Sequence, residues 1–462
     1  MNPDCPIDPA IFRAYDIRGV VGTSLDARAV ELIGRAIGSE ATARGQQRMV
    51  VARDGRLSSP SLAAALTVGL RASGRDVIDL GLCPTPAMYF ATHAFGTRSG
   101  VIVTASHNPA DQNGLKIVLD GETLCGDAIQ DLARRIGRSD FVIGHGALES
   151  ADPLPAYIER IVSDIDLARR MRIVIDCGNG VAGIVARRLF EALGCETLVL
   201  FEEVDGRFPH HHPDPSRPDN LASLIREVSD RQADLGLAFD GDGDRLGVVD
   251  ASGTIIWPDR LLMLFAIDVL SRHPGADILF DIKCSRHMPQ LIVAHGGRPL
   301  MWKSGHSLMK AKLAETGAPL GGERSGHIFF ADRWYGFDDG LYAGARLLEL
   351  LSRDCRTSTE VFEDLPNSAN TPEISLPLPE GESIRVAEQL RQAAEFPDAV
   401  ITGIDGLRVD FADGFFLARA SNTSSALILR FEGDDRAALD RVRQRFDELL
   451  HRVRPDLDAP AS

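Results

Sequence analysis

The chain has 462 residues, of which 44% are hydrophobic and 25% are charged, and its formal net charge at pH 7 is −16. These proportions are typical of a globular protein with several domains, since a single domain usually holds about 100–200 residues. The acidic balance argues against a general affinity for nucleic acid or for an anionic membrane surface.

The seven cysteines are scattered and contain no Cys-x-x-Cys pair. This pattern predicts free thiols in a reducing compartment rather than a disulfide framework or a zinc site. The N-terminal segment is acidic and lacks the apolar core of a signal peptide. The most apolar run, residues 261–270, is about half the length needed to span a bilayer. We therefore expect a cytoplasmic protein with no membrane partner.

Short β-branched runs alternate with helical stretches along most of the chain, which favours βαβ units and buried, mostly parallel sheets. Three of the runs, at 49–56, 171–180 and 276–285, each contain an apolar strand that ends in aspartate, at Asp54, Asp176 and Asp281. Their spacing of about one small domain predicts three copies of one α/β unit. After residue 380 the sequence changes to strands joined by polar turns and a final amphipathic helix, which predicts a different, α+β domain.

Clusters of Pro, Ser and Asn near 148–156, 252–258 and 366–380 are candidate linkers. They divide the chain into four expected domains. The domains are 1–150 with a turn of small polar residues around one serine, 151–254 with a carboxylate loop, 255–367 with a glycine-rich polar loop, and 368–462 with a loop of hydroxyl and amide residues.

The first candidate site follows a buried strand at residues 100–116, where a turn holds Thr104, Ser106, His107 and Asn108. Taken alone, this composition favours an ordinary turn or a helix cap. The functional alternative is a nucleophile or phosphate carrier at Ser106, with His107 and Lys116 beside it. A serine can hold a phosphoryl group only where a metal or cations offset its charge.

Two runs of the second domain offer competing interpretations. Residues 178–183 match Gly-x-Gly-x-x-Gly between a strand and a helix, with Glu202 nineteen residues later. This is the context of a dinucleotide-binding turn and carries the alternative of an NAD-dependent oxidoreductase. The proline-rich run at 208–220 holds three consecutive histidines, which cannot all face one point. We interpret it as a surface loop rather than a metal site.

The most informative run is residues 235–250, in which Asp240, Asp242 and Asp244 alternate with glycines between two apolar segments and precede Arg245. Three carboxylates at this spacing can converge on one hard cation, and their mutual repulsion would be costly without one. They leave coordination positions open for phosphate and water, which suits Mg²⁺ with a phosphorylated ligand. A solvated acidic hairpin is the alternative.

Two further runs carry polar groups of moderate specificity. At 319–330, Glu323, Ser325 and His327 alternate on a glycine-rich loop and suit a hydroxyl-rich ligand such as a sugar. At 418–430, Arg419 precedes three residues with hydroxyl or amide groups, and this combination is a plausible phosphate cradle. Those three residues are Ser421, Asn422 and Thr423.

Four motifs, TASHNP at 104–109, DGDGDR at 240–245, GERSGH at 322–327 and RASNTS at 419–424, together resemble the α-D-phosphohexomutase superfamily. Within it, the chain looks most like the bacterial phosphomannomutase/phosphoglucomutase group. The resemblance covers nearly the whole chain. It implies three similar α/β domains with mixed, mostly parallel sheets and a fourth α+β domain, arranged around a central cleft.

The resemblance also implies a role for each motif residue. Ser106 carries the phosphoryl group, and Ser106, Asp240, Asp242 and Asp244 bind Mg²⁺. The resemblance assigns catalysis to Ser106, Arg18, His107, Lys116, Arg245 and His327. It assigns substrate binding to Tyr15, Lys283, His306, Glu323, Ser325, Arg419, Ser421, Asn422 and Thr423.

The implied activity is the interconversion of 1-phospho and 6-phospho hexoses by an isomerase-class phosphotransferase, with glucose 1,6-bisphosphate as intermediate and activator. One departure from the group is Arg324, which stands where methionine is usual. We expect activity on glucose and mannose phosphates, and keep phosphoglucosamine mutase as the alternative within the class. The expected partners are small phosphosugars, and we expect a monomer.

Overall fold

Each of the first three domains contains the same four-strand arrangement, in which a central strand has parallel neighbours on both sides and an antiparallel strand follows at one edge. The computed structural model describes residues 7–379, 381–421 and 425–460. In the three sheets the corresponding strand orders are β5-β4-β2-β3, β11-β10-β8-β9 and β16-β15-β13-β14. The predicted threefold repeat is therefore confirmed. The sheets are mixed, with parallel pairs at the centre and antiparallel pairs toward one edge.

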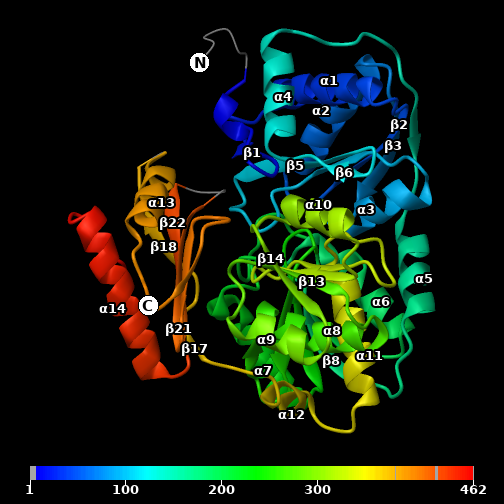
Figure 1. The fold of residues 1–462 in the computed structure, drawn as a ribbon. Helices are drawn as coiled ribbons and strands as arrows, with labels where there is room; N and C mark the ends of the chain where they lie inside the picture. The colour runs from blue at the N-terminus through cyan, green and yellow to red at the C-terminus, as the bar shows by residue number, and fades with distance from the viewer. Residues whose placement is uncertain (1–6, 380, 422–424, 461–462) are drawn as a thin grey trace.

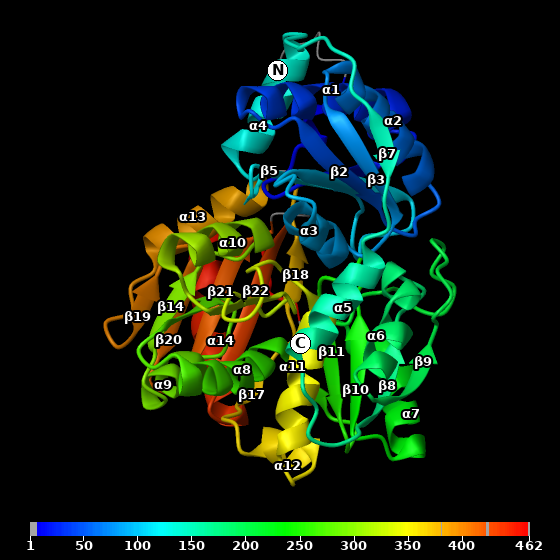
Figure 2. The same cartoon turned by 90° about the vertical axis from the view of Figure 1, so that its right-hand side faces the viewer.

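The first domain has a seven-stranded sheet with helices on both faces (Figures 1 and 2). Alternate residues of the buried central strand β2 face opposite layers. Met49 and Val51 belong to the apolar cluster of α1, α2 and α4. Val50 and Ala52 belong to the cluster that contains α3. The elements are β1 (Ile17–Val20), α1 (Ala27–Ala43), β2 (Arg48–Arg53), α2 (Ser59–Ala72), β3 (Asp76–Leu82), α3 (Thr85–Ala94), β4 (Gly100–Val103), β5 (Gln112–Leu119), β6 (Glu122–Thr123), α4 (Asp127–Gly137) and β7 (Leu148–Ser150).

The second and third domains have five-stranded and four-stranded sheets. The short strand β12 pairs with β11, so the second sheet extends to Ile256, two residues past the expected end of that domain. The elements of the second domain are α5 (Leu154–Asp164), β8 (Arg172–Asp176), α6 (Ala186–Ala192), β9 (Glu196–Leu200), α7 (Ala222–Arg231), β10 (Leu235–Phe239), β11 (Leu246–Asp250) and β12 (Ile255–Ile256). Those of the third are α8 (Pro258–Arg272), β13 (Asp277–Asp281), α9 (His287–Ala294), β14 (Arg298–Trp302), α10 (His306–Thr316), β15 (Leu320–Gly322), β16 (Ile328–Phe330), α11 (Gly340–Arg353) and α12 (Ser358–Glu363).

The fourth domain is an antiparallel sheet with two helices, and it stands beside the third domain with α14 on its outer side (Figure 1). The predicted change to an α+β domain after residue 380 is confirmed. The elements are β17 (Ala369–Asn370), β18 (Ile374–Pro377), α13 (Glu382–Ala393), β19 (Val400–Thr402), β20 (Leu407–Phe411), β21 (Gly414–Ala420), β22 (Ala426–Gly433) and α14 (Arg436–Val453).

The first three domains share an apolar core, and the fourth has its own. One continuous cluster of buried residues runs from Val50 in the first sheet through the second and third domains to Leu365. The fourth domain's cluster joins its sheet to α13 and α14. Between the third and fourth domains, the buried apolar cluster of the described chain consists of Ile282, Phe415 and Leu417. Met301 and Ile404 pack against this cluster, and polar contacts also join the two domains. Arg408, for example, donates to the carbonyls of Ile282 and Cys284.

Among the described residues, no helix combines the length and the apolar character needed to cross a membrane. The cysteines described, Cys83, Cys125, Cys177, Cys195, Cys284 and Cys355, are free thiols.

Helices α1 and α2 lie unusually close together because a glycine stands on each contacting surface. A Cβ on Gly69 would lie 2.1 Å from the carbonyl oxygen of Glu31, a distance that real side chains do not reach. We expect Gly69→Ala to separate the helices and to destabilise the first domain by about 1–3 kcal/mol, the usual cost of overpacking. Thermal unfolding followed by circular dichroism measures the effect.

The matched control is Gly137→Ala at the end of α4, where a Cβ would meet no atom within 4 Å. Alanine has the higher helix propensity, so this variant should be neutral or more stable by about 0.5–1 kcal/mol. Equal destabilisation by both substitutions would contradict the close-packing argument.

Candidate active site

Three loops that occupy equivalent positions in the first three domains meet at one cleft. Residues 104–111 connect β4 to β5, residues 240–245 connect β10 to β11, and residues 323–327 connect β15 to β16. The cleft has a volume of about 660 Å³. Of the predicted site residues, the following line it: Tyr15, Arg18, His107, Arg245, Lys283, His306, Glu323, Ser325, His327, Arg419 and Ser421.

The other predicted residues lie directly beneath this lining or outside the described residues. Ser106, Lys116 and the three aspartates of residues 240–244 are each at most 2% exposed. Asn422 and Thr423 fall in the part of the chain that the structure does not describe. The structure thus brings together all the predicted site residues that it describes.

Ser106 is held at the tip of its loop against the second domain. Its backbone is in the left-handed region, with φ of 52°, and its Oγ donates a hydrogen bond to Asp240 Oδ2 at 2.6 Å. The two loops approach this closely because residue 241 is glycine. A Cβ there would lie 2.4 Å from the carbonyl oxygen of Ser106. The buried Arg56 secures the same loop by donating to the carbonyls of Ser106 and Asn108.

The three aspartates form a compact buried group, and each offers an oxygen within 4.8 Å of the others. Lys116 Nζ donates to Asp242 Oδ2 at 2.7 Å and to Asp244 Oδ2, which offsets part of their negative charge. Burial and the neighbouring carboxylates raise the pKa of Asp240 well above its usual value. Asp242 Oδ1 has no hydrogen-bond partner although it is buried. An oxygen-rich group with an unused acceptor fits a hard divalent cation such as Mg²⁺.

The three cleft histidines have different protonation behaviour. Burial and the nearby Arg245 lower the pKa of His107 to about 4, and burial and Lys310 lower the pKa of His306 well below its usual value. Burial and Arg245 also act on His327, but Asp244 and Glu323 outweigh them and raise its pKa to about 9. His327 therefore carries a proton at neutral pH, and the other two are neutral.

The third-domain loop presents Glu323, Ser325 and His327 to the cleft. Glu323 Oε2 lies 2.7 Å from His327 Nδ1, and Glu323 Oε1 accepts a hydrogen bond from the backbone of Gly305. Ser325 Oγ lies 3.2 Å from His327 Nδ1. The loop thus supplies a carboxylate, a hydroxyl and an imidazole within one turn, the donors and acceptors that a hydroxyl-rich ligand needs.

Cations of the third and fourth domains lie where these two domains meet at the cleft. Arg419 Nε donates to Asp405 Oδ2 at 3.0 Å. Lys283 of the third domain reaches across to Glu373, with 2.7 Å between Nζ and Oε1. Both cations are held in place by carboxylates at the cleft wall, where they can meet an anionic ligand.

Arg324 lines the cleft together with Trp257. Its guanidinium lies over the ring of Trp257 at 4.3 Å, and its Nε is 3.3 Å from Asp259 Oδ2. Asp259 has a second cationic partner, Arg430, at 3.2 Å. The residue that departs from the expected motif is therefore held by an aromatic ring and a carboxylate at the edge of the cleft.

Arg217 lies at the cleft, and the sequence analysis did not identify it. It belongs to the proline-rich run 208–220 and is exposed. Of the lysines and arginines that line the described cleft, it is the one without an ion pair. The only sequence signal was an arginine within a run interpreted as a surface loop. His210, His211 and His212 of that run contact three different groups, Asn179, Asp176 and the carbonyl of His107, so they do not form a metal site.

The dinucleotide-binding interpretation of residues 178–183 is wrong. Val181 donates its backbone N–H to the carbonyl of Gly241, and a Cβ on Gly183 would lie 1.9 Å from the carbonyl oxygen of Glu202. Glu202 itself is paired with Arg187 at 2.6 Å. The glycines allow this segment to pack closely against the carboxylate loop and the end of β9. Because these contacts occupy the turn, a pyrophosphate has no room to bind there.

Sequence comparison matches all four parts of the chain to one family. Models of the phosphoglucomutase/phosphomannomutase family match residues 9–142 (alpha/beta/alpha domain I), 155–253 (alpha/beta/alpha domain II), 257–369 (alpha/beta/alpha domain III) and 373–449 (C-terminal domain).

Individual relatives agree with this match. The chain is 54% identical over 456 residues to a phosphomannomutase/phosphoglucomutase of Pseudomonas aeruginosa, and the match covers 98% of each chain. It is 50% identical to a phosphoglucomutase of Neisseria gonorrhoeae, with 95% and 96% of the two chains covered. A crystal structure of a phosphoglucomutase/phosphomannomutase family protein from Burkholderia thailandensis superposes with a TM-score of 0.94 at 52% identity, covering 98% of this chain and 100% of that one.

Thr85, at the start of α3, connects the first domain to the carboxylate loop. Its Oγ1 donates to Asp242 Oδ2 at 2.6 Å, and its backbone N–H donates to the carbonyl of Asp242. We expect Thr85→Val to weaken Mg²⁺ binding by about tenfold, since groups that orient a metal ligand have effects of this size. Isothermal titration of the protein with Mg²⁺ measures the change.

Thr92→Val in the same helix is the control, because the Thr92 hydroxyl donates to the carbonyl of Tyr89 and does not reach the loop. Its Mg²⁺ affinity should equal that of the unmodified protein. The proposed link between α3 and the metal site fails if the two variants bind Mg²⁺ alike.

Proposed function

The chain belongs to the phosphoglucomutase/phosphomannomutase family and is a hexose-phosphate mutase, and we propose that it moves a phosphoryl group between the C1 and C6 hydroxyls of glucose and of mannose. The observation that carries this proposal is the position of Ser106. Its hydroxyl contacts the three-aspartate group and lies beneath a cleft lined by cations from all four domains. This arrangement suits a serine that accepts and returns a phosphoryl group.

In the first transfer, phospho-Ser106 gives its phosphoryl group to the free hydroxyl of a hexose monophosphate. The Ser106 O–P bond breaks as the sugar O–P bond forms, and the hydroxyl proton passes to a base in the cleft. The product is a 1,6-bisphosphosugar. The intermediate then reorients in the cleft. Its other phosphoryl group is transferred to Ser106, and the freed sugar oxygen takes up a proton. Glucose 1,6-bisphosphate would prime unphosphorylated enzyme by the second of these transfers.

Charge neutralisation is the main requirement of such transfers, because the protein contributes little covalent chemistry. Asp240, Asp242 and Asp244 would hold Mg²⁺ beside the phosphoryl group on Ser106. When bound, Mg²⁺ offsets the negative charge on the transferring group. Arg245 and Lys116 supply further positive charge at the same place. Lys116 already contacts two of the aspartates.

Proton transfer falls to groups near the reacting oxygens. His327 is protonated at neutral pH and paired with Glu323, so it can donate its proton to the freed sugar oxygen in the second transfer. The neutral ring that results can accept the hydroxyl proton in the first transfer of the next cycle. Arg18 donates to Asp16 and to the carbonyl of Ala105, which places its guanidinium beside the Ser106 loop. We assign Arg18 to charge stabilisation there.

Substrate recognition is divided between two loops. Glu323 and Ser325 would accept hydrogen bonds from sugar hydroxyls. Arg419 and Ser421, with Asn422 and Thr423, would hold the phosphate that is not being transferred. This division lets one cleft bind the sugar in two orientations, because the distal phosphate meets the same cations in both.

Replacing the phosphoryl carrier should abolish turnover. We expect Ser106→Ala to lower kcat by a factor on the order of 10³ or more, because no other group can take over the covalent step. Mass spectrometry should find one phosphoryl group on the unmodified protein after treatment with glucose 1,6-bisphosphate, and none on the variant. Ser325→Ala, the control, should lose activity only partly and keep the phosphoryl group. A phosphorylated or fully active Ser106→Ala protein would exclude the assignment.

The choice of sugar is tested with glucose 1-phosphate and mannose 1-phosphate, each primed with its bisphosphosugar in the presence of Mg²⁺. We expect comparable kcat/KM for the two, since Arg324 is turned toward Trp257. Arg324→Met should change both values by the same factor and leave their ratio unchanged. A changed ratio would show that Arg324 selects the sugar. Activity confined to glucosamine 1-phosphate would overturn the proposed substrates.

A further inference from the structure

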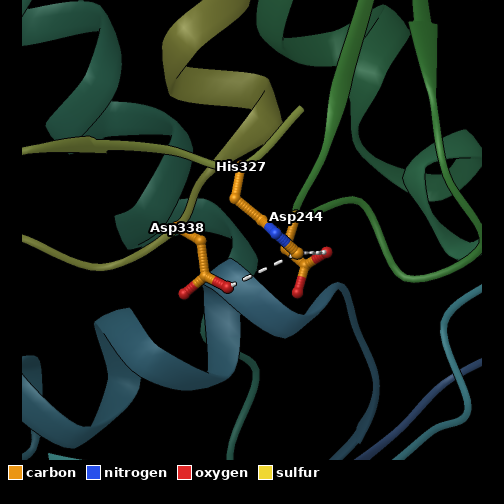
Figure 3. A group of neighbouring side chains, drawn as sticks. All are labelled: Asp244, His327 and Asp338. Carbon is orange, nitrogen blue, oxygen red and sulfur yellow. Dashed lines mark ion pairs between the residues drawn. The ribbon is translucent and has the colours of Figure 1, made fainter. Parts of the chain in front are cut away.

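Four side chains surround a small gap just below the cleft floor, beside the three-aspartate group. Asp244 comes from the β10–β11 loop, His306 from the start of α10, His327 from the β15–β16 loop, and Asp338 from the turn before α11. Each is at most 6% exposed. Figure 3 shows the carboxylates of Asp244 and Asp338 on two sides of the His327 imidazole.

Ligand atoms of Asp244, His327 and Asp338 all lie within 4.8 Å of one another, and His306 adjoins this group through Asp338. His327 Nε2 lies 3.4 Å from Asp244 Oδ1 and 3.9 Å from Asp338 Oδ2, and His306 Nδ1 lies 3.5 Å from Asp338 Oδ2. Ligands about 2.0–2.1 Å from a tetrahedral zinc ion are roughly 3.3–3.5 Å apart. Asp244, His327 and Asp338 approach this spacing, and His306 would have to move toward them to complete the site.

Among the described residues, three of the four side chains bring atoms without a hydrogen bond to the gap, whereas His327 Nε2 faces Arg245. Asp244 Oδ1, Asp338 Oδ2 and both ring nitrogens of His306 have no hydrogen-bond partner. The opposite oxygens are occupied, since Lys116 donates to Asp244 Oδ2 and Lys310 to Asp338 Oδ1. Buried polar atoms are rarely left unpaired, so their convergence on one point indicates a missing ligand.

The surroundings of His327 match those of a metal-binding histidine. Its Nδ1 is turned to Glu323 Oε2 at 2.7 Å, which directs Nε2 toward the two aspartates. A carboxylate behind the imidazole is the usual arrangement for a histidine that binds zinc. Arg245 Nε lies 3.2 Å from His327 Nε2, and this guanidinium would have to move toward Asp240 when a cation enters.

From this geometry we propose that Asp244, His306, His327 and Asp338 form a second divalent-metal site, which takes a borderline cation such as Zn²⁺. Two imidazole nitrogens and two carboxylate oxygens suit zinc better than magnesium, which prefers an all-oxygen octahedron. The site shares Asp244 with the three-aspartate group. Occupancy by zinc would therefore oppose Mg²⁺ binding, and it would also engage two histidines that line the cleft. The expected effect on turnover is inhibition.

Cobalt is the probe for this site, because four-coordinate Co²⁺ absorbs visible light much more strongly than six-coordinate Co²⁺. We expect Co²⁺ added to the full-length protein in excess Mg²⁺ to give the intense four-coordinate spectrum, and one equivalent of Zn²⁺ to remove it. No substrate is needed, so the result does not depend on the proposed sugar chemistry. A weak, six-coordinate spectrum would overturn the proposal.

Variants separate the two metal sites. Asp338→Asn should abolish the intense spectrum and reduce inhibition by Zn²⁺ at least tenfold. Asp242→Asn alters the three-aspartate group without touching the gap and should keep the spectrum. His306→Gln gives a second test that does not depend on how Asp338→Asn folds, and the folding of each variant is checked by thermal unfolding. A spectrum lost in Asp242→Asn but retained in Asp338→Asn and His306→Gln would place the cation at the three aspartates instead.

Discussion

The ion pairs of Lys116 with Asp242 and Asp244 are the contact on which the architecture of the cleft depends. Lys116 lies on β5 of the first domain, and the aspartates lie on the β10–β11 loop of the second. Three buried carboxylates would repel one another strongly without a positive charge among them. The ammonium group supplies that charge and at the same time joins two domains. It thereby holds the Ser106 loop against the carboxylate loop.

Three repeated domains place three different chemistries at the same position of the same scaffold. In each, the hairpin that follows the central parallel strands carries the functional loop: a serine turn, a carboxylate turn, and a turn with glutamate, serine and histidine. The strands behind these loops remain alike, including the aspartate that ends each central strand. The loops can differ because the strands form the hydrogen bonds of the sheet and the connecting segments do not.

The sequence predicted the repeat and the cleft motifs because both depend on local patterns. Apolar strands that end in Asp54, Asp176 and Asp281 and short polar runs can be recognised within a few residues. The position of Arg217 and the gap around Asp338 could not be predicted in this way, because each depends on how segments far apart in the chain come together. The glycines at 178–183 were wrongly interpreted as a dinucleotide-binding turn for the same reason. Their role in close packing is seen only from the contact of this segment with Gly241, which is distant in the sequence.

The separate core of the fourth domain has a consequence for the chemistry of the phosphoenzyme. Its buried apolar contact with the rest of the described chain is small, centred on Ile282, Phe415 and Leu417, and polar contacts such as that of Arg408 add to it. In the proposed mechanism, local unfolding of this domain would leave the other three folded, with Ser106 still phosphorylated and Arg419 displaced. Water would then be the remaining acceptor. A firmly docked fourth domain would thus protect the proposed phosphoenzyme from hydrolysis as well as hold its substrate.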